Sequence, residues 1–279
     1  MSFGVPALKQ NKLTVVTSLP EHQATIELIS KANVNTICLE GHCPNLGGCF
    51  SRGIATFLIL GTVCTRKCSF CAVPKGKPLA ADPGEPFRIT GAARQMGLQR
   101  VVITSVTRDD LEDGGAGYFA QTVRLLKTSG IKEVEVLVPD FRGEEGRLRT
   151  VLDAKPDIIA HNLETVPRLY PLVRAGASYR RSLKVIEKAS DYSPNVQIKS
   201  GIMLGLGEQE AEIKTVMKEL WGVGCTILTL GQYLQPSRAQ IPVAEYISPE
   251  QFEYYRLLGL ETGFKKVWSG ALVRSSMAY

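Results

Sequence analysis

The 279-residue sequence has no long apolar run, no basic and apolar leader, and no block of five or more like charges. A transmembrane helix needs about 20 apolar residues, and a secretory signal needs a positive start, an apolar centre and small residues. We therefore expect a cytoplasmic protein without a membrane anchor. Its net charge of +6 is scattered along the chain, whereas nucleic-acid binding needs a concentrated basic stripe. We expect no nucleic-acid partner.

The sequence also lacks internal repeats, low-complexity segments and Ser/Gly linkers that would mark a second globular domain. From Ala55 onward, short apolar runs alternate with amphipathic helical runs, which is typical of parallel βα units. Six strands are expected, over residues 55–60, 100–106, 133–138, 157–161, 196–204 and 225–232. The predicted fold class is α/β, a partial (β/α)6 TIM-type barrel whose ligands bind in the loops that follow the strands.

The predicted barrel extends over residues 55–263. It follows an N-terminal extension that carries cysteines (1–54) and precedes a C-terminal tail (264–279). The last helix has a clear start, because Ser248 is a favourable N-cap, Pro249 suits the first helical position, and Gln251 is a capping-box partner.

Histidine is scarce, with three residues, whereas six of the seven cysteines gather in two triplets. The triplets are C-x4-C-x5-C at Cys38, Cys43 and Cys49, and C-x3-C-x2-C at Cys64, Cys68 and Cys71. An odd cysteine count without a secretory signal argues against a disulfide framework. A structural zinc site needs four N or S ligands, and only His42 lies near the cysteines. The seventh cysteine, Cys225, begins an apolar strand and is expected in the core.

A thiolate triplet on a tight loop can bind three irons of a cubane [4Fe-4S] cluster. Two such cubanes contain eight irons, and six thiolates would bind six of them. Two irons are then left for other ligands. The counting predicts two incompletely thiol-ligated clusters.

The downstream segment Cys64-Thr65-Arg66-Lys67-Cys68-Ser69-Phe70-Cys71 resembles the motif of the radical S-adenosylmethionine (SAM) superfamily. In that superfamily the open iron chelates SAM, and an electron from the cluster cleaves the sulfonium to give a 5′-deoxyadenosyl radical. The upstream segment, residues 38–49, resembles the auxiliary-cluster motif of the lipoyl synthase family. The resemblance continues from about residue 30 to Ser276, including Arg108-Asp109-Asp110-Leu111 and His161-Asn162-Leu163-Glu164.

This resemblance implies a radical SAM sulfurtransferase that inserts two sulfur atoms at C6 and C8 of a protein-bound octanoyl-lysine to form the lipoyl cofactor. It implies two [4Fe-4S] clusters, one that binds SAM and one auxiliary cluster that is consumed as the sulfur donor. The substrate partner would be an octanoylated lipoyl carrier domain or a glycine-cleavage carrier protein. A ferredoxin- or flavodoxin-type reductant would supply electrons, and we expect a monomer.

The tail Arg274-Ser275-Ser276 resembles the family's Arg-Ser-Ser-Tyr segment, in which a serine oxygen completes the auxiliary cluster. By position this role maps to Ser276, although Met277-Ala278-Tyr279 departs from the family's Tyr-His continuation. Contacts to SAM are expected from the strand-end loops, including close backbone approach at two glycines. The candidates are Ser105, Asn162, Glu164, Gln232, Gly205 and Gly207.

Several other polar residues near these motifs have a structural interpretation. Salt bridges within the loops are favoured for Asp109 and Asp110, and a hydrogen bond to a backbone carbonyl is favoured for His161. The turn at Gly205-Leu206-Gly207 is either an ordinary strand-to-helix turn or a cofactor contact. A basic patch beside the downstream triplet is either a solvated face or a docking site for an acidic carrier or reductant; it comprises Arg66, Lys67, Lys75 and Lys77.

Three alternative functions are consistent with parts of the pattern. Biotin synthase is another radical SAM enzyme that inserts sulfur, but the upstream triplet does not resemble it. Non-catalytic iron–sulfur electron carriers are usually short and bind each cluster with four cysteines. A metal-stapled binding module is the third alternative.

Overall fold

The computed structural model describes residues 20–50 and 54–276. Residues 1–19 and 51–53 of the predicted extension, and the atypical Met277-Ala278-Tyr279 ending, lie outside the described residues. Within the described ranges, no helix combines the length and apolar character that a membrane span requires.

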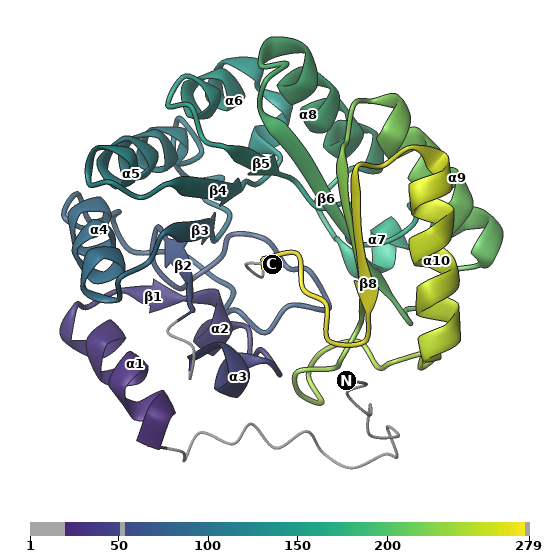
Figure 1. Cartoon of the computed structure of the whole chain (residues 1–279), viewed down its shortest axis with the longest axis horizontal. Helices are drawn as coiled ribbons and strands as arrows, with labels where there is room; N and C mark the ends of the chain where they lie inside the picture. The colour runs from purple at the N-terminus through teal and green to yellow at the C-terminus, as the bar shows by residue number, and fades with distance from the viewer. Residues whose placement is uncertain (1–19, 51–53, 277–279) are drawn as a thin grey trace.

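One curved sheet forms the centre of the molecule, with its strands in sequence order from β1 to β8 (Figure 1). The strands are β1 (Asn35–Thr36), β2 (Thr56–Ile59), β3 (Arg100–Ser105), β4 (Glu133–Leu137), β5 (Ile158–Ala160), β6 (Gln197–Leu204), β7 (Ile227–Gln232) and β8 (Lys266–Gly270). β1 pairs antiparallel with β2, and β2 to β8 are parallel. Among the described residues no pairing joins β8 to β1, so the barrel is open, as the predicted partial barrel requires.

All six predicted strands are present, as β2 to β7. The sheet also contains two strands that the sequence patterns did not indicate, β8 and the two-residue strand β1. β8 begins at Lys266, within the segment predicted as the C-terminal tail, and pairs in parallel with β7. The sheet therefore extends beyond residue 263, whereas the division into extension, barrel and tail stays a prediction.

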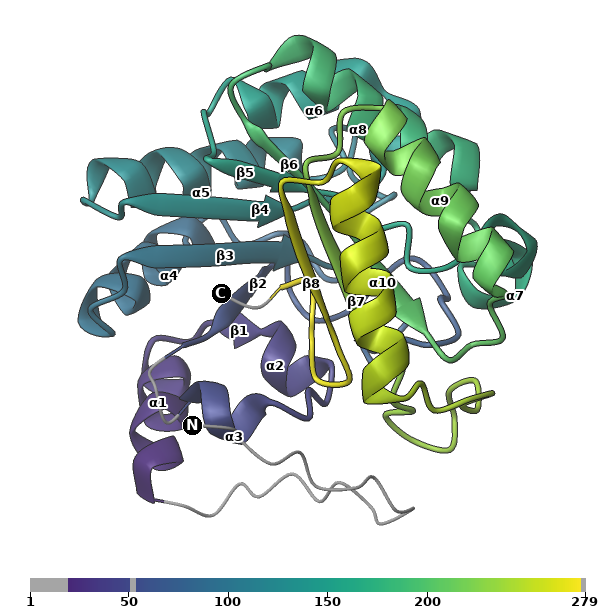
Figure 2. The same cartoon turned by 45° about the vertical axis from the view of Figure 1, so that its right-hand side comes forward.

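The larger helices cover the outer face of the sheet (Figures 1 and 2). The helices are α1 (Pro20–Lys31), α2 (Ile37–Glu40), α3 (Leu46–Phe50), α4 (Glu85–Gln95), α5 (Ala116–Thr128), α6 (Glu145–Leu152), α7 (Tyr170–Val173), α8 (Tyr179–Tyr192), α9 (Glu210–Gly222) and α10 (Pro249–Thr262), with 3-10 turns η1 (Phe141–Gly143) and η2 (Pro167–Leu169). In α4, α5, α8 and α10, helical spacing of apolar residues places one face against the strands. α5 buries Phe119, Val123 and Leu126 in this way.

Helix α10 starts where its sequence signal predicts. The Ser248 hydroxyl accepts a hydrogen bond from the Gln251 N–H at 3.2 Å, and Pro249 occupies the first helical position. Phe252 and Tyr255 are buried on the face that follows. This helix packs against β8, which places the start of the C-terminal tail beside β7.

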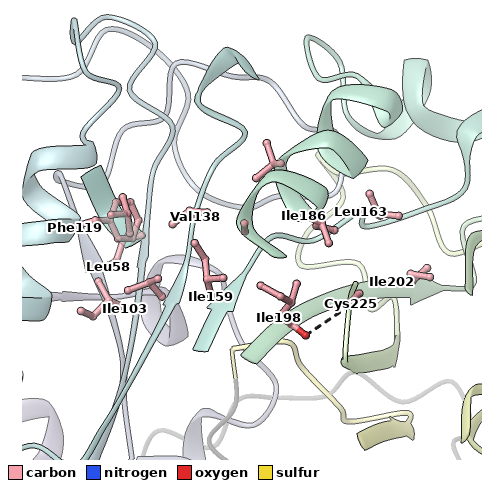
Figure 3. Close-up of a cluster of buried hydrophobic side chains, with 14 of the residues drawn as sticks. Leu58, Ile103, Phe119, Val138, Ile159, Leu163, Ile186, Ile198, Ile202 and Cys225 are labelled. Carbon is pink, nitrogen blue, oxygen red and sulfur yellow. Dashed lines mark hydrogen bonds between the residues drawn. The ribbon is translucent and has the colours of Figure 1, made fainter. Parts of the chain in front are cut away.

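Apolar side chains from neighbouring strands and helices form a continuous core (Figure 3). Cys225 lies inside it, 1% exposed, and its Sγ donates to the Ile198 carbonyl at 3.8 Å. Burial raises the pKa of the Cys225 thiol to about 12. The predicted packing role of this cysteine is confirmed.

The inner face of the sheet carries buried charges. Lys199 Nζ lies 2.7 Å from Glu135 Oε1, and Arg100 Nη2 lies 2.7 Å from the other oxygen of the same carboxylate. Lys199 and Glu135 are fully buried. Because side chains on one face of a strand recur at every second residue, Lys199 lies on the same face of β6 as Gly201, which lines the cavity described below.

Candidate functional site

A cavity of about 520 Å³ lies at the carboxyl ends of the strands. Its wall contains thiols from both triplets, several predicted cofactor contacts and the tail serines: Cys38, Cys43, Cys64, Cys68, Cys71, Ser105, Asn162, Glu164, Gln232, Ser275 and Ser276. Segments that are far apart in the sequence therefore meet at one site. The wall does not include Cys49, Gly205 or Gly207.

The downstream triplet lies on the loop that follows β2. The Cys64 N–H donates to the Pro74 carbonyl at 2.8 Å, and the Gly76 N–H donates to the Cys64 carbonyl at 3.0 Å, which folds the loop back on itself. The Cys64 Sγ accepts hydrogen bonds from the backbone N–H groups of Arg66 and Thr107 at 3.4 and 3.3 Å. These two hydrogen bonds fix the position of the Cys64 sulfur, which lines the cavity.

An ion-pair network holds this loop against the rim of the barrel. Arg66, between Cys64 and Cys68, pairs with Asp109 at 2.8 Å and with Asp140 at 2.6 Å. Arg181 pairs with the other Asp140 oxygen at 2.7 Å. Burial opposes ionisation of Asp140, but hydrogen bonds and charge from the two arginines hold its pKa well below its usual value.

The predicted salt bridges of the aspartates are confirmed. Asp109 pairs with Arg66 and also with Arg142 at 3.2 Å. Asp110 pairs with Arg108 at 2.9 Å. Arg108 is buried and also donates to the Leu60 carbonyl at 3.2 Å, so this second pair braces the end of β2.

The upstream triplet lies on α2, α3 and the turn between them. The Cys43 N–H donates to the Cys38 carbonyl at 3.0 Å, which brings the two ends of that turn together. Burial raises the pKa of the Cys38 thiol to about 12; hydrogen bonds with Thr56 oppose this shift, and Cys43 and Cys49 add to it. All three thiols are free. Cys43 and Cys49 lie close enough to Cys38 to affect its pKa, although no three acidic, cysteine or histidine side chains of the described residues are arranged to hold a single metal ion.

The C-terminal tail runs from the end of β8 toward β2 and the upstream triplet (Figures 1 and 2). The Asn45 amide donates to the Leu272 carbonyl at 2.6 Å, and the Thr56 hydroxyl donates to the Ser276 carbonyl at 2.7 Å. Thr56 also hydrogen-bonds with Cys38. The structure thus places Ser276 beside the upstream triplet.

Two of the predicted SAM contacts present unpartnered polar atoms. Ser105 Oγ and Asn162 Oδ1 are buried and have no hydrogen-bond partner among the described residues. Burial raises the pKa of the Glu164 carboxyl group, which accepts a hydrogen bond from Asn162 Nδ2 at 3.1 Å. Buried polar atoms are normally paired, so these groups can receive a ligand.

The other three predicted SAM contacts have structural tasks. Gln232 Nε2 donates to the carbonyls of Leu204 and Glu245 at 3.2 and 3.0 Å, which fixes the loop after β7. Gly205 and Gly207 have positive φ angles of 99° and 105° in the turn between β6 and α9. The structure supports the strand-to-helix interpretation of that turn and does not bring its glycines into the cavity.

His161 makes the predicted hydrogen bond to a backbone carbonyl. Its Nδ1 lies 2.8 Å from the Val138 carbonyl. Burial and the nearby charge of Arg174 lower the pKa of His161 to about 4. The ring is therefore neutral near pH 7, and Nδ1 donates to the carbonyl.

Arg174 is a cavity residue that the sequence patterns did not indicate. Its Nη1 donates to the Asn162 carbonyl at 2.7 Å and to the Tyr170 hydroxyl at 3.0 Å. Its buried Nε has no acceptor among the described residues. Burial lowers the pKa of Arg174, but the neighbouring Tyr170, Glu164 and Cys68 outweigh it and raise the pKa overall. No motif marks a single arginine in a loop, so only the fold reveals this cation.

The predicted basic patch is smaller in the structure. Arg66 is buried in its ion pairs, whereas Lys67, Lys75 and Lys77 are exposed. Lys75 also lines the cavity. Three lysines therefore remain at the surface beside the downstream triplet.

An open α/β barrel with a C-x3-C-x2-C loop after a strand at its cavity defines a radical SAM enzyme. The Radical SAM superfamily matches residues 58–220 of this chain, and membership implies SAM and a [4Fe-4S] cluster. The fold resembles that of methylornithine synthase, with a TM-score of 0.54, 16% identity, and coverage of 98% of this chain and 85% of that one. It also resembles SuiB of Streptococcus suis bound to SAM, with a TM-score of 0.59, 12% identity, and coverage of 80% and 53%.

Sequence relatives identify the particular family. A lipoyl synthase of Caldanaerobacter subterraneus is 56% identical over 87% of this chain and 86% of its own length. A lipoyl synthase of Syntrophotalea carbinolica is 52% identical over 92% and 84%. The chain belongs to the lipoyl synthase family and is a radical SAM sulfurtransferase that forms the lipoyl cofactor. This membership decides against the electron-carrier and binding-module interpretations.

Proposed function

We propose that the two cysteine triplets hold two [4Fe-4S] clusters with different tasks, SAM binding downstream and sulfur donation upstream. The observation that carries this proposal is that thiols of both triplets line one cavity. Sulfur can reach a substrate radical only if the sulfur donor and the site of radical formation face the same enclosed space.

The residues at the site fit two such clusters. Each triplet contributes three free thiols and no fourth, as a cubane with one open iron requires. Oxygen-bearing side chains line the same cavity as the thiols. Ser276 is near the upstream thiols, and the cavity around the downstream thiols contains the unpartnered Ser105 and Asn162 atoms.

When bound, the downstream cluster and SAM supply a carbon-centred oxidant, and the upstream cluster supplies sulfide for C6 and C8 of an octanoyl-lysine. The chain's own residues position these groups. The Arg66 ion pairs with Asp109 and Asp140 fix the orientation of the downstream loop. The cavity, at the carboxyl ends of the strands, shields the reacting groups from water.

Four cavity residues are suited to hold the polar parts of SAM. The Arg174 guanidinium can pair with the carboxylate of the methionine portion, because a buried arginine is a strong carboxylate partner. Asn162 and Glu164 offer hydrogen-bonding groups for the ribose hydroxyls. Ser105 provides a further hydroxyl.

Ser276 would complete the upstream cluster through oxygen. Iron–sulfur clusters are normally held by thiolates, and oxygen is the weaker ligand. A replaceable ligand suits a cluster that must open to release sulfur. The contact between Thr56 and the Ser276 carbonyl supports this placement.

The partners follow from the family and the surface. Lipoyl cofactor formation requires an octanoylated carrier, which would be a lipoyl domain or a glycine-cleavage carrier protein. The exposed lysines Lys67, Lys75 and Lys77 offer positive charge to an acidic carrier or to a ferredoxin- or flavodoxin-type reductant. We place the enzyme in the cytoplasm, where reducing conditions keep its thiols free. We also propose that it is a monomer.

Two cysteine variants test the division of tasks. In anaerobically reconstituted protein, Cys43→Ala should still form 5′-deoxyadenosine from SAM and should no longer produce a lipoyl group on an octanoylated carrier. Cys68→Ala should lose both products. Cys225→Ala, which removes a core thiol, is the matched control and should retain both. Loss of SAM cleavage in Cys43→Ala together with full iron retention would contradict the proposal.

A further inference from the structure

The end of the C-terminal tail, residues 271–276, is fitted to the sheet. A Cβ atom on Gly231 of β7 would lie 2.2 Å from the Val273 carbonyl oxygen. Non-bonded atoms do not approach this closely, so β7 leaves room for the tail backbone because residue 231 is glycine. The Ser275 hydroxyl accepts a hydrogen bond from Asn162 Nδ2 at 2.7 Å. The barrel therefore holds one side of this segment.

Asn45 joins the same segment to the upstream triplet. It lies between Cys43 and Cys49 in the sequence, and its Nδ2 donates to the Leu272 carbonyl at 2.6 Å. Its backbone N–H hydrogen-bonds to the Cys43 sulfur. Its backbone carbonyl accepts from the Cys49 N–H at 2.9 Å. One residue therefore contacts two of the three triplet cysteines and also the tail.

Thr56 makes a corresponding connection at the third cysteine. Its hydroxyl donates to the Ser276 carbonyl at 2.7 Å, and it also hydrogen-bonds with Cys38. The tail is thus connected to the upstream triplet at two points, Leu272 through Asn45 and Ser276 through Thr56.

The contact at Leu272 requires a particular kind of side chain at position 45. A backbone carbonyl only accepts hydrogen bonds, so its partner must donate. The Asn45 amide donates from Nδ2. A carboxylate of the same size only accepts, and it would repel the carbonyl oxygen. Asparagine therefore suits this position through its contact with the tail.

We propose that Asn45 is a positioning residue that sets the C-terminal tail against the upstream triplet. Its backbone is bound to Cys43 and Cys49, whereas its side chain is bound to the tail. The loop that carries the thiols therefore also determines where Ser276 lies. This inference rests on the proposed role of Ser276 as the oxygen ligand of the upstream cluster.

Hydrogen–deuterium exchange of the cluster-free full chain tests the contact itself. Asn45→Ala removes the donor without adding charge, and Asn45→Asp removes it at constant size. In both variants the peptide that contains residues 271–276 should exchange about five-fold faster, because one neutral hydrogen bond contributes about that factor. Asn195→Ala, at an exposed asparagine between α8 and β6, is the control and should match the parent. Faster exchange in Asn45→Asp alone would assign the effect to charge and overturn the proposal.

Loss of iron to a chelator tests the consequence for the upstream cluster. The probe is an iron chelator added to the ⁵⁷Fe-reconstituted protein, with the two cluster environments followed separately by Mössbauer spectroscopy. In Asn45→Ala the upstream environment should decay about five-fold faster than in the parent, because the tail that carries its oxygen ligand is less often in place. The environment that responds to added SAM should decay at the parent's rate. Equal acceleration of both would indicate a general loss of structure and would contradict a positioning role.

The outcomes distinguish this inference from the proposed function. If the parent binds about eight irons but exchange of residues 271–276 in both Asn45 variants equals that of the parent, the positioning role is wrong and the two-cluster proposal stands. If the parent contains only four irons in one environment, the proposed function fails. The exchange comparison is made without clusters, so it still decides whether Asn45 holds the tail.

Discussion

Neutralising Asp140 should weaken the fold at the loop that carries the downstream triplet. Its fully buried carboxylate lies between Arg66 at 2.6 Å and Arg181 at 2.7 Å. Removing one partner of a buried ion pair costs about 3–5 kcal/mol. In Asp140→Asn, Arg66 keeps its ion pair with Asp109. We therefore expect a loss at the lower end of that range, about 3 kcal/mol in the free energy of unfolding, which is a factor of about 150 in the unfolding equilibrium.

The assay is urea unfolding of the cluster-free chain at pH 7 under reducing conditions. Glu253→Gln is the control, because Glu253 pairs with Arg256 on the surface of α10, where such pairs contribute about 0–1 kcal/mol. A loss below about 1 kcal/mol in Asp140→Asn, equal to the control, would refute the view that this network anchors the loop.

The pH dependence gives a second readout of the same network. The folded-state pKa of Asp140 is held below its unfolded value of about 3.9. Its stabilisation is therefore complete well above pH 4 and is lost as the pH falls through the folded-state pKa. The stability difference between the parent and Asp140→Asn should be constant from about pH 5 to 7 and should shrink in acid. A difference that grows on acidification would contradict this assignment.

Three further predictions concern buried groups. The pKa of His161 is lowered to about 4, so ¹³C-histidine NMR should show a neutral ring at pH 5. The parent chain should lose stability as the pH falls from about 6.5 through about 4, and His161→Gln should not show this loss. A His161 titration near pH 6.5 in the folded protein would contradict the prediction. Cys225→Ala should lower the free energy of unfolding by about 1 kcal/mol and leave the iron content unchanged. A lower iron content in this variant would show that the Cys225 thiol ligates iron. Lys199→Met should lower the free energy of unfolding by about 3 kcal/mol, and adding Glu135→Leu should recover part of that loss. If the effects of the two substitutions on the free energy of unfolding simply add in the double variant, the two residues are not coupled.

Much of the fold was predictable because strong local patterns mark its parallel strands. β2 to β7 are apolar runs followed by polar loops, and each formed as expected. β1 has two residues, and β8 has only Val267 buried, so neither carries enough apolar character to be recognised. These two strands form through pairing with a neighbour that already exists in the sheet.

The site was predictable where spacing reports chemistry and was not where it depends on distant contacts. The C-x3-C-x2-C and C-x4-C-x5-C patterns identified thiol groups directly. Arg174 and the Asn162–Ser275 hydrogen bond join segments that meet only once the barrel is formed. Gln232 lines the cavity and also donates from its amide to backbone carbonyls, so its contact with SAM stays a prediction.

Iron stoichiometry combined with Mössbauer spectroscopy of the ⁵⁷Fe-reconstituted chain tests the two-cluster assignment most directly. We predict about eight irons per chain in two distinct [4Fe-4S] environments, one of which changes its spectrum when SAM is added. Four irons in a single environment, or zinc in either triplet, would contradict it.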